Sequence, residues 1–317
     1  MYNRMLVLLD GSKLAEIVLT YARELAGRLS LNLDLLHVCS PEESELLPMR
    51  QAYVEHMAEK LRSESEEIRQ KAGEPGTGKA IEARGKVVVG YPADEILHYA
   101  EGNSIDIILM ATHGRSGRRQ WGLGSVADKV LRASHRPVWL VPAGIPQDVI
   151  FDKRPRRIML IPLDGSIQAE SVLPHVEMLS KQRGATTERI LVRVCEPSLL
   201  TESEYGLVPL KEYGQLPEKW EDYVELEQAR NKASCDEYLA GVVRRLSEVG
   251  LDSRAVTLRG NPSEELIKYI AQNPPQIIVM ATHGRSGISR FTFGSVTERI
   301  LFSSQVPIFV VRPSDKT

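Results

Sequence analysis

The sequence predicts an α/β fold built from two tandem domains, each with a five-stranded, mostly parallel, doubly wound sheet. Two observations lead to this prediction. One block of sequence returns in the second half of the 317 residues, and within each copy short apolar runs alternate with segments of helical periodicity. Alternating strands and helices form a parallel sheet covered on both faces, with right-handed crossovers.

The internal repeat can be read from matching segments. Residues Met5–Ser12 (MLVLLDGS) return as Met159–Ser166 (MLIPLDGS), and Met110–Gly117 (MATHGRSG) returns unchanged as Met280–Gly287. Identity at corresponding places of two copies indicates duplication, which sets the domain count before any finer analysis.

The repeat also predicts the domain boundaries. We expect a first domain over residues 1–144, a linker over residues 145–156 and a second domain over residues 157–317. The linker region is polar and rich in proline, as is typical of inter-domain segments. The second copy is longer mainly around Leu199–Trp220, where aromatic residues leave a lid or an interaction surface as alternatives.

The apolar runs predict five strands in each copy. The predicted strands are Met5–Leu9, Leu31–Val38, Lys79–Val89, Ile105–Met110 and Pro137–Val141, then Ile158–Leu163, Ile190–Val194, Ser253–Leu258, Ile277–Met280 and Pro307–Val311. The helices expected in the first copy are one capped by Ser12, then Arg50–Lys71, Pro92–Tyr99 and Ser125–Ala133. In this fold the ligand crevice lies beyond the carboxyl ends of the strands, where the strand order reverses.

Composition narrows the class of protein. The chain is 42% hydrophobic and 26% charged, with a net charge of −2, so it lacks the basic excess of a nucleic-acid binder. No apolar run approaches the length of a membrane span, and the first residues lack a signal-peptide pattern, so we expect a cytoplasmic protein. Cys39, Cys195 and Cys235 lack metal-ligand spacing, and the first two are expected to be buried at equivalent strand ends.

The strongest chemical pattern is the loop after the fourth strand. Gly114 and Gly117 let backbone N–H groups approach a ligand closely, and Arg115 is one of three arginines in the loop. Gly124 then leads into a helix that begins at Ser125, and a helix start favours phosphate through its unpaired N–H groups and dipole. The loop is longer than a strand–helix connection requires, which favours a functional role.

At these residues the chain resembles the universal stress protein family. ATP-binding members of that family carry Gly-x-x-Gly, nine residues, then Gly-Ser or Gly-Thr. Here residues 111–114 are followed by nine residues and Gly124-Ser125, and residues 281–284 by nine residues and Gly294-Ser295. Both copies depart from the motif at its first glycine, which is Ala111 or Ala281. Alanine keeps the backbone N–H, so we expect nucleotide binding to be tolerated.

The resemblance implies Rossmann-like domains of the adenine nucleotide alpha hydrolase-like type, with strand order 3-2-1-4-5. It implies ATP as the ligand, with ADP or AMP as alternatives and Mg²⁺ as an optional companion of the phosphates. It further implies that the two domains pair through their last strands, Val138–Val141 and Ile308–Val311, which would remove two exposed sheet edges. A homodimer is a further expectation, and the protein partner is left open.

The resemblance also implies a binding set in each copy. Around the base and ribose it comprises Leu8, Asp10, Val38 and Met110, and Pro162, Asp164, Val194 and Met280. Around the phosphates it comprises Ala111, Gly114, Arg115, Gly117, Gly124, Ser125 and Val126, and Ala281, Gly284, Arg285, Gly287, Gly294, Ser295 and Val296. The aspartates would bind the ribose hydroxyls, and the valines that end the second strands would offer backbone groups to adenine.

Several of these residues have a structural interpretation as well. An Asp before Gly-Ser commonly satisfies a turn, although its recurrence in both copies favours a ligand role for Asp10 and Asp164. His113 and His283 invite a catalytic or metal-binding role. No carboxylate or second histidine is spaced to join either, so a structural hydrogen bond is favoured, and neither a catalytic residue nor a metal site is assigned.

Three functions compete at this point. The leading hypothesis is an ATP-binding stress-response sensor or adaptor. The alternative is a slow ATP hydrolase or nucleotidyl-transfer enzyme, although the loop offers no carboxylate placed as a base or Mg²⁺ ligand. The third is a scaffold whose sites stay empty. Residues 118–123 are more cationic than residues 288–293, so we expect nucleotide binding at both sites with unequal affinity.

Overall fold

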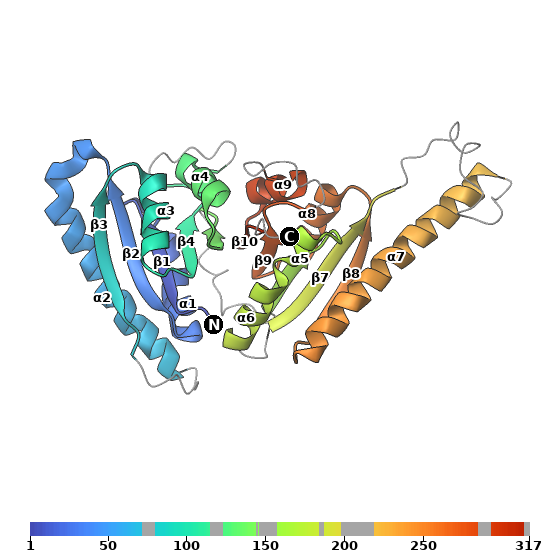
Figure 1. Ribbon diagram of the computed structural model, residues 1–317, viewed down its shortest axis with the longest axis horizontal. Coiled ribbons are helices and arrows are strands. Elements are labelled where there is room, and N and C mark those ends of the chain that lie inside the picture. Colours follow the sequence, from blue (N-terminus) through green and yellow to red (C-terminus); the bar gives the residue numbers. More distant parts are fainter. Residues whose placement is uncertain are drawn as a thin grey trace.

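The computed structural model describes residues 1–71, 80–114, 123–143, 145, 157–183, 187–197, 219–284 and 293–313. Its ten strands form one sheet in the order β3-β2-β1-β4-β5-β10-β9-β6-β7-β8 (Figure 1). Each half therefore has the order 3-2-1-4-5, which confirms the predicted strand order and the doubly wound α/β fold. Residues 146–156 of the expected linker and residues 199–218 of the insertion lie outside the described residues.

The first half runs from β1 to β5. Its strands are β1 (Arg4–Leu9), β2 (Asn32–Cys39), β3 (Ala83–Val89), β4 (Ile107–Ala111) and β5 (Val138–Val141). Its helices are α1 (Ile17–Leu29), the short 3-10 helix η1 (Pro41–Leu46), α2 (Leu47–Lys71), α3 (Pro92–Gly102) and α4 (Ser125–Ala133).

The second half repeats this order. Its strands are β6 (Arg157–Pro162), β7 (Thr187–Cys195), β8 (Ser253–Arg259), β9 (Ile277–Ala281) and β10 (Ile308–Val311). Its helices are α5 (Ile167–Glu170), α6 (Leu173–Arg183), α7 (Trp220–Glu248), α8 (Pro262–Gln272) and α9 (Ser295–Ser303). The long helices α2 and α7 flank the two outer ends of the sheet (Figure 1).

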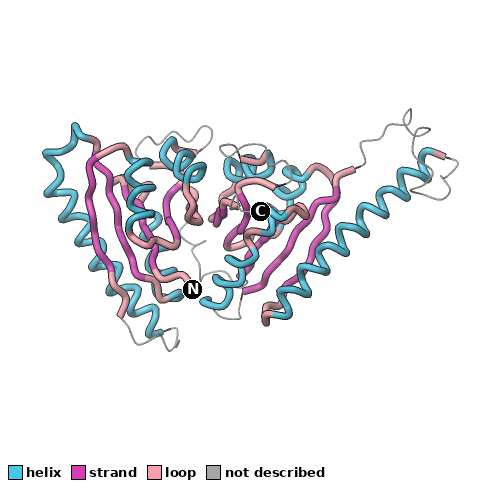
Figure 2. The backbone as a smooth tube through the Cα atoms, viewed as in Figure 1, coloured by secondary structure: helices cyan, strands magenta, loops and turns pink. Residues whose placement is uncertain are grey.

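Helices cover both faces of the sheet (Figure 2). Alternate residues of each central strand point to opposite faces, so Val7 packs with α1 and α2 while Leu6 packs with α3 and α4. The α6 and α7 side chains join the first of these two cores, and those of α8 and α9 join the second. Because both faces are covered, the inner strands are apolar along their length, as in β4, where all five residues are buried.

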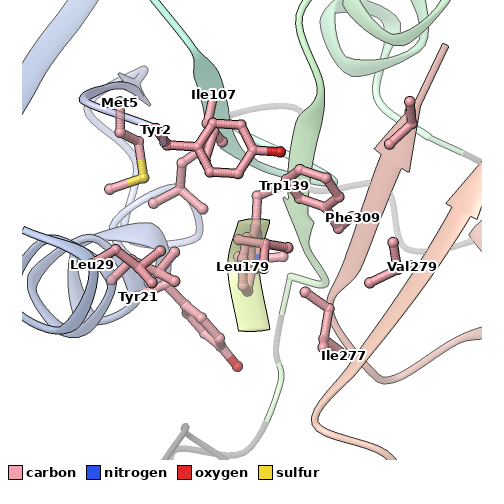
Figure 3. Close-up of a cluster of buried hydrophobic side chains, with 14 of the residues drawn as sticks. Tyr2, Met5, Tyr21, Leu29, Ile107, Trp139, Leu179, Ile277, Val279 and Phe309 are labelled. Carbon is pink, nitrogen blue, oxygen red and sulfur yellow. The ribbon is translucent and has the colours of Figure 1, made fainter. Parts of the chain in front are cut away.

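The two halves meet where β5 pairs with β10. This pairing is antiparallel, whereas the other neighbouring strands pair in parallel, and it sets Trp139 opposite Phe309. The two rings meet edge to face with centroids 5.6 Å apart, and both residues are fully buried. Tyr2 lies beside this pair (Figure 3), and its hydroxyl hydrogen-bonds Nδ1 of His175 on α6. Aromatic residues from both halves thus form one continuous core.

Two local expectations differ from the structure: the third strand, expected over Lys79–Val89, begins only at Ala83, and the first long helix begins later than expected. Ser12 was expected to cap the first long helix, but its Oγ accepts a hydrogen bond from the Ala15 N–H within a separate turn, and α1 begins only at Ile17. In the second copy Ser166 caps the short helix α5, and α6 follows it. In both copies the serine therefore stabilises the short segment after the first strand, and the long helix, α1 or α6, begins several residues later.

We predict that Trp139→Ala lowers the free energy of unfolding by about 3–5 kcal/mol, because it removes a fully buried indole from the junction of the halves. Phe309→Ala is expected to have a similar effect, and a double-mutant cycle should give a coupling of about 0.5–1.5 kcal/mol. Urea unfolding measures both. Phe302→Ala, at a side chain 48% exposed, is the control and should change stability by less than about 0.5 kcal/mol. A loss below about 1 kcal/mol for Trp139→Ala would contradict the importance of the junction.

Burial also predicts a pH dependence at the junction. It lowers the pKa of His175 below its ordinary value of 6.5, so the unfolded chain binds a proton there that the folded chain does not. Stability should therefore fall as the pH drops through about 6.5. Urea midpoints at pH 7.5 and 5.5 should show a larger loss for the wild type than for His175→Gln. An equal loss in the two proteins would exclude His175 as the cause.

Candidate functional site

A cavity of about 410 Å³ opens beyond the carboxyl ends of β1, β2 and β4 in the first half. It lies where the strand order reverses, between β1 and β4. Of the expected binding set, the residues that line it are Leu8, Asp10, Val38, Met110, Ala111, Gly114, Gly124, Ser125 and Val126. Arg115 and Gly117 lie outside the described residues.

The second half carries an equivalent cavity of about 430 Å³. The residues of the expected set that line it are Pro162, Asp164, Val194, Met280, Ala281, Gly284, Gly294, Ser295 and Val296. Arg285 and Gly287 lie outside the described residues. Segments far apart in sequence thus meet at one place in each half, and both volumes lie within the range typical of small-molecule sites, about 300–1,000 Å³.

The aspartate at the end of the first strand holds a tight turn. In the first half Asp10 Oδ1 accepts a hydrogen bond from the Ser12 N–H at 2.9 Å, and Gly11 has the left-handed φ of 77° that such a turn requires. In the second half Asp164 Oδ1 accepts from both the N–H (2.9 Å) and the hydroxyl (2.6 Å) of Ser166. The turn role considered from the sequence is therefore present in both copies, through one carboxylate oxygen.

The other carboxylate oxygen lies against the glycine loop. A Cβ placed on Gly114 would be 1.9 Å from Asp10 Oδ2, and a Cβ on Gly284 would be 1.9 Å from Asp164 Oδ2. A side chain at either glycine would overlap the carboxylate, so glycine is required by close approach. The contact joins the end of the first strand to the loop after the fourth, and it places a carboxylate oxygen at the wall of each cavity.

The helix that closes each cavity starts in the same way. The Gly124 N–H donates to the Thr112 carbonyl at 2.9 Å, and α4 begins at the next residue, Ser125. Gly294 makes the equivalent bond to Thr282, also at 2.9 Å, before α9. A glycine at the N-cap has no side chain with which to occupy the first N–H groups of the helix. Those donors and the helix dipole therefore remain available to a ligand in the cavity.

Each site histidine bonds to the threonine before it. His113 Nδ1 lies 3.1 Å from Thr112 Oγ1, and His283 Nδ1 lies 2.9 Å from Thr282 Oγ1. The Thr112 hydroxyl also accepts the Ala143 N–H at 2.9 Å, which ties the loop to the segment after β5. Both rings line their cavities, and these bonds fit the structural role favoured from the sequence.

The second cavity has a polar wall that the repeat motifs do not reveal. Asn261 caps α8, and its Oδ1 accepts from the Ser263 hydroxyl at 2.8 Å. Ser263 Oγ in turn accepts from Arg299 Nη1 at 3.0 Å, and all three residues line the cavity. Their counterparts 170 residues earlier, Tyr91, Ala93 and Lys129, do not line the first cavity. A comparison of the two copies at these positions would have identified Asn261, Ser263 and Arg299 from the sequence.

Cysteine chemistry does not extend the site. Cys39 and Cys195 are buried at the ends of β2 and β7, as predicted, and Cys235 is buried on α7. Burial raises the pKa of the Cys195 thiol to about 12, so the thiolate that a nucleophile requires is scarce at neutral pH.

The described His, Cys, Asp and Glu side chains do not form groups of three or more that could hold a metal ion. Within the same ranges no helix has the length and apolar character to cross a bilayer.

Fold and site together define a class: tandem doubly wound α/β domains with a glycine-rich loop and a helix start at each switch point. The family model described as the universal stress protein family matches residues 1–142 and again residues 155–312. The chain therefore belongs to the universal stress protein family, with two copies of the family's domain in tandem.

Individual relatives agree with this assignment. The chain is 29% identical over 147 residues to universal stress protein YxiE of Bacillus subtilis, covering 44% of this chain and 99% of that protein. It is 23% identical over 239 residues to universal stress protein Rv2005c of Mycobacterium tuberculosis, covering 75% and 72% of the two chains. The structure is similar to the crystal structure of a universal stress protein from Archaeoglobus fulgidus, with a TM-score of 0.60, 19% identity and coverage of 99% and 100%. At that identity the likeness shows the fold.

The contact between Asp10 and Gly114 gives a testable prediction. Gly114→Ala should lower the free energy of unfolding by about 1–3 kcal/mol, because the new methyl group overlaps the Asp10 carboxylate. Gly241→Ala is the matched control, since nothing lies within 4 Å of the Cβ it would add within α7; it should be neutral or stabilise by up to about 1 kcal/mol. Denaturant unfolding of both variants, and of Gly114→Ala combined with Asp10→Ala, measures the effect. If removal of the carboxylate fails to relieve the loss, the contact is not its cause.

Proposed function

We propose that each half of this protein binds one adenine nucleotide, and that the chain works as a cytoplasmic, nucleotide-dependent sensor or adaptor in a stress response. The observation that carries the proposal is the duplicated cavity itself. In both halves an aspartate, an apolar wall, a glycine loop and an uncapped helix start surround one small-molecule-sized space. These are the chemical groups that a nucleoside phosphate requires.

The base end of each cavity is apolar. Leu8, Val38 and Met110 line it in the first half, and Pro162, Val194 and Met280 line it in the second. In the proposed complex adenine packs on these side chains, and the backbone at Val38 or Val194 hydrogen-bonds its edge. The aspartate Oδ2 that lies against the loop glycine accepts a hydrogen bond from a ribose hydroxyl, while Oδ1 keeps the turn.

The phosphate end is built from backbone donors. The phosphates lie at the start of α4 or α9, where the hydroxyl of Ser125 or Ser295 and the N–H of the following valine add donors. Arg115, Arg285 and the loop glycines complete the proposed set. ATP, ADP and AMP share these groups, and Mg²⁺ would accompany the longer phosphate chains. Binding and release of nucleotide, with little or no turnover, is the behaviour expected of such a site.

The two sites differ in charge, which makes their affinities unequal. Arg299 lines the second cavity, where its exposed guanidinium donates to Ser263 and lies 3.7 Å from a Glu264 carboxylate oxygen. Lys129, the exposed cation at the corresponding position, does not line the first cavity. A guanidinium at the cavity wall favours an anionic ligand. A second difference therefore supports the unequal affinity expected from the loop sequences. Here it is the second cavity that has a cationic side chain in its wall.

We predict that calorimetric titration with ATP resolves two sites of different affinity. Arg299→Leu should weaken one of them about tenfold, because a hydrogen bond to a charged group contributes about 1.5–3 kcal/mol and solvent screens this exposed side chain. Lys129→Leu is the matched control and should leave both affinities unchanged. Asp10→Asn and Asp164→Asn should each weaken a different site.

The outcomes against the proposal are definite. Absence of binding for ATP, ADP and AMP would contradict it, and steady multiple turnover of labelled ATP would favour the hydrolase alternative. Equal affinity at both sites would remove the assigned role of Arg299 while leaving nucleotide binding intact.

A further inference from the structure

A third hollow, of about 540 Å³, lies at the end of the second half opposite to its nucleotide cavity. It is bordered by the last turn of α6, the residues that follow α7 and the first residues of β7 and β8. These elements are labelled in Figure 1. The polar side chains around it are Ser180, Lys181, Thr187, Glu188, Arg189, Asp252, Ser253 and Arg254. It shares no residue with either cavity described above.

Arg189 is the unusual residue of this hollow, because it is a cation only 4% exposed. Its Nε donates to Ser180 Oγ at 2.8 Å and its Nη1 to the Asp252 carbonyl at 3.1 Å. Both acceptors are neutral, and no carboxylate of the described residues forms an ion pair with it. Burial lowers the pKa of Arg189, and the Asp252 carboxylate offsets this only in part. An arginine nevertheless stays charged at neutral pH.

The repeat shows that the fold does not require a charge here. Met5 pairs with Leu33 in the first half, and its counterpart Met159 pairs with Arg189 in the second, so Arg189 occupies the position of Leu33. Likewise Ser180 stands 154 residues after Ala26. Both first-copy residues are fully buried and apolar. The second copy therefore holds a serine–arginine pair where the first has an apolar contact, and it buries a cation whose charge is only partly offset.

The other two cations at the hollow are already paired with carboxylates, so Arg189 is the cation available to a ligand. Lys181 is paired with Glu177 at 2.5 Å and Arg254 with Glu188 at 3.3 Å, both at the surface. Nη2 of Arg189 donates to none of the described residues, and the side chain lines the hollow. The buried hydroxyl of Ser253 likewise has no hydrogen-bond partner in the described part of the chain.

We propose that this hollow is an oxyanion site in which Arg189 binds a single phosphate group. The anion would supply the missing counter-charge, and the planar fork of the guanidinium suits phosphate oxygens. The nearby Asp252 and Glu188 carboxylates oppose a larger polyanion, so the ligand is a small phosphate rather than a nucleoside triphosphate. Free inorganic phosphate and a small phosphate monoester share this chemistry.

The decisive variant restores the packing of the first copy. Ser180→Ala combined with Arg189→Leu recreates the Ala26–Leu33 pair, which the fold already accommodates in its other half. Equilibrium dialysis with radiolabelled inorganic phosphate should show one phosphate per chain fewer in this variant than in the wild type. A parallel series with glycerol phosphate distinguishes the free anion from a monoester. Sodium chloride at matched ionic strength controls for screening.

Nucleotide sites can also hold phosphate, so a second comparison separates the two proposals. Asp10→Asn with Asp164→Asn should impair nucleotide binding and leave the Arg189-dependent phosphate in place. In thermal unfolding, phosphate should raise the Tm of the wild type more than that of the restored variant, which should be at least as stable without phosphate. Equal phosphate binding and equal phosphate-dependent shifts in the two proteins would overturn the proposal, and Arg189 would then be a clamp between α6 and the start of β8.

Discussion

The antiparallel pairing of β5 with β10 is the interaction on which the arrangement of the whole chain depends. Each half alone would end in a short apolar strand with unpaired backbone groups, an edge that invites aggregation. Pairing the two edges satisfies those groups within one chain and joins two five-stranded sheets into a continuous ten-stranded one. Trp139 and Phe309 then fill the space at the seam, so hydrogen bonding and aromatic packing stabilise the same junction.

The junction also brings α4, which starts at the first cavity, into contact with the residue before the start of α9 at the second. Arg132, near the end of α4, places its guanidinium 4.3 Å from the ring centroid of Phe293, which directly precedes Gly294 and the start of α9. Arg312, just after β10, donates to the Arg132 carbonyl at 2.6 Å. The helix that begins at the first cavity therefore ends against the residue that precedes the second helix start.

The sequence was sufficient for the fold because its signals are local and repeated. Short apolar runs alternating with helical segments predicted the doubly wound sheet and the meeting of Asp10 with the loop, and the family resemblance supplied the strand order. Two kinds of feature escaped prediction. The start of α1 depends on whether Ser12 caps a short turn or the long helix. In either case the Ser12 hydroxyl accepts a backbone N–H three residues later, so the sequence does not distinguish the two. The role of Arg299 depends on the conformation of its exposed side chain, which is oriented by a hydrogen bond to Ser263 on α8.

Comparison of the two copies accounts for the unpredicted polar residues of the second half, whereas the late start of α1 concerns the first half. Once one copy forms the common fold, the other can replace an apolar pair with a charged one, provided the fold retains enough stability from its other contacts. Arg189 at the position of Leu33, and Ser263 at that of Ala93, are both changes from an apolar residue to a polar one at a buried place. A buried polar group destabilises unless it is satisfied, and Ser263 is satisfied by Asn261 and Arg299. Arg189 is satisfied only in part, and by the same reasoning its remaining donors point to a ligand.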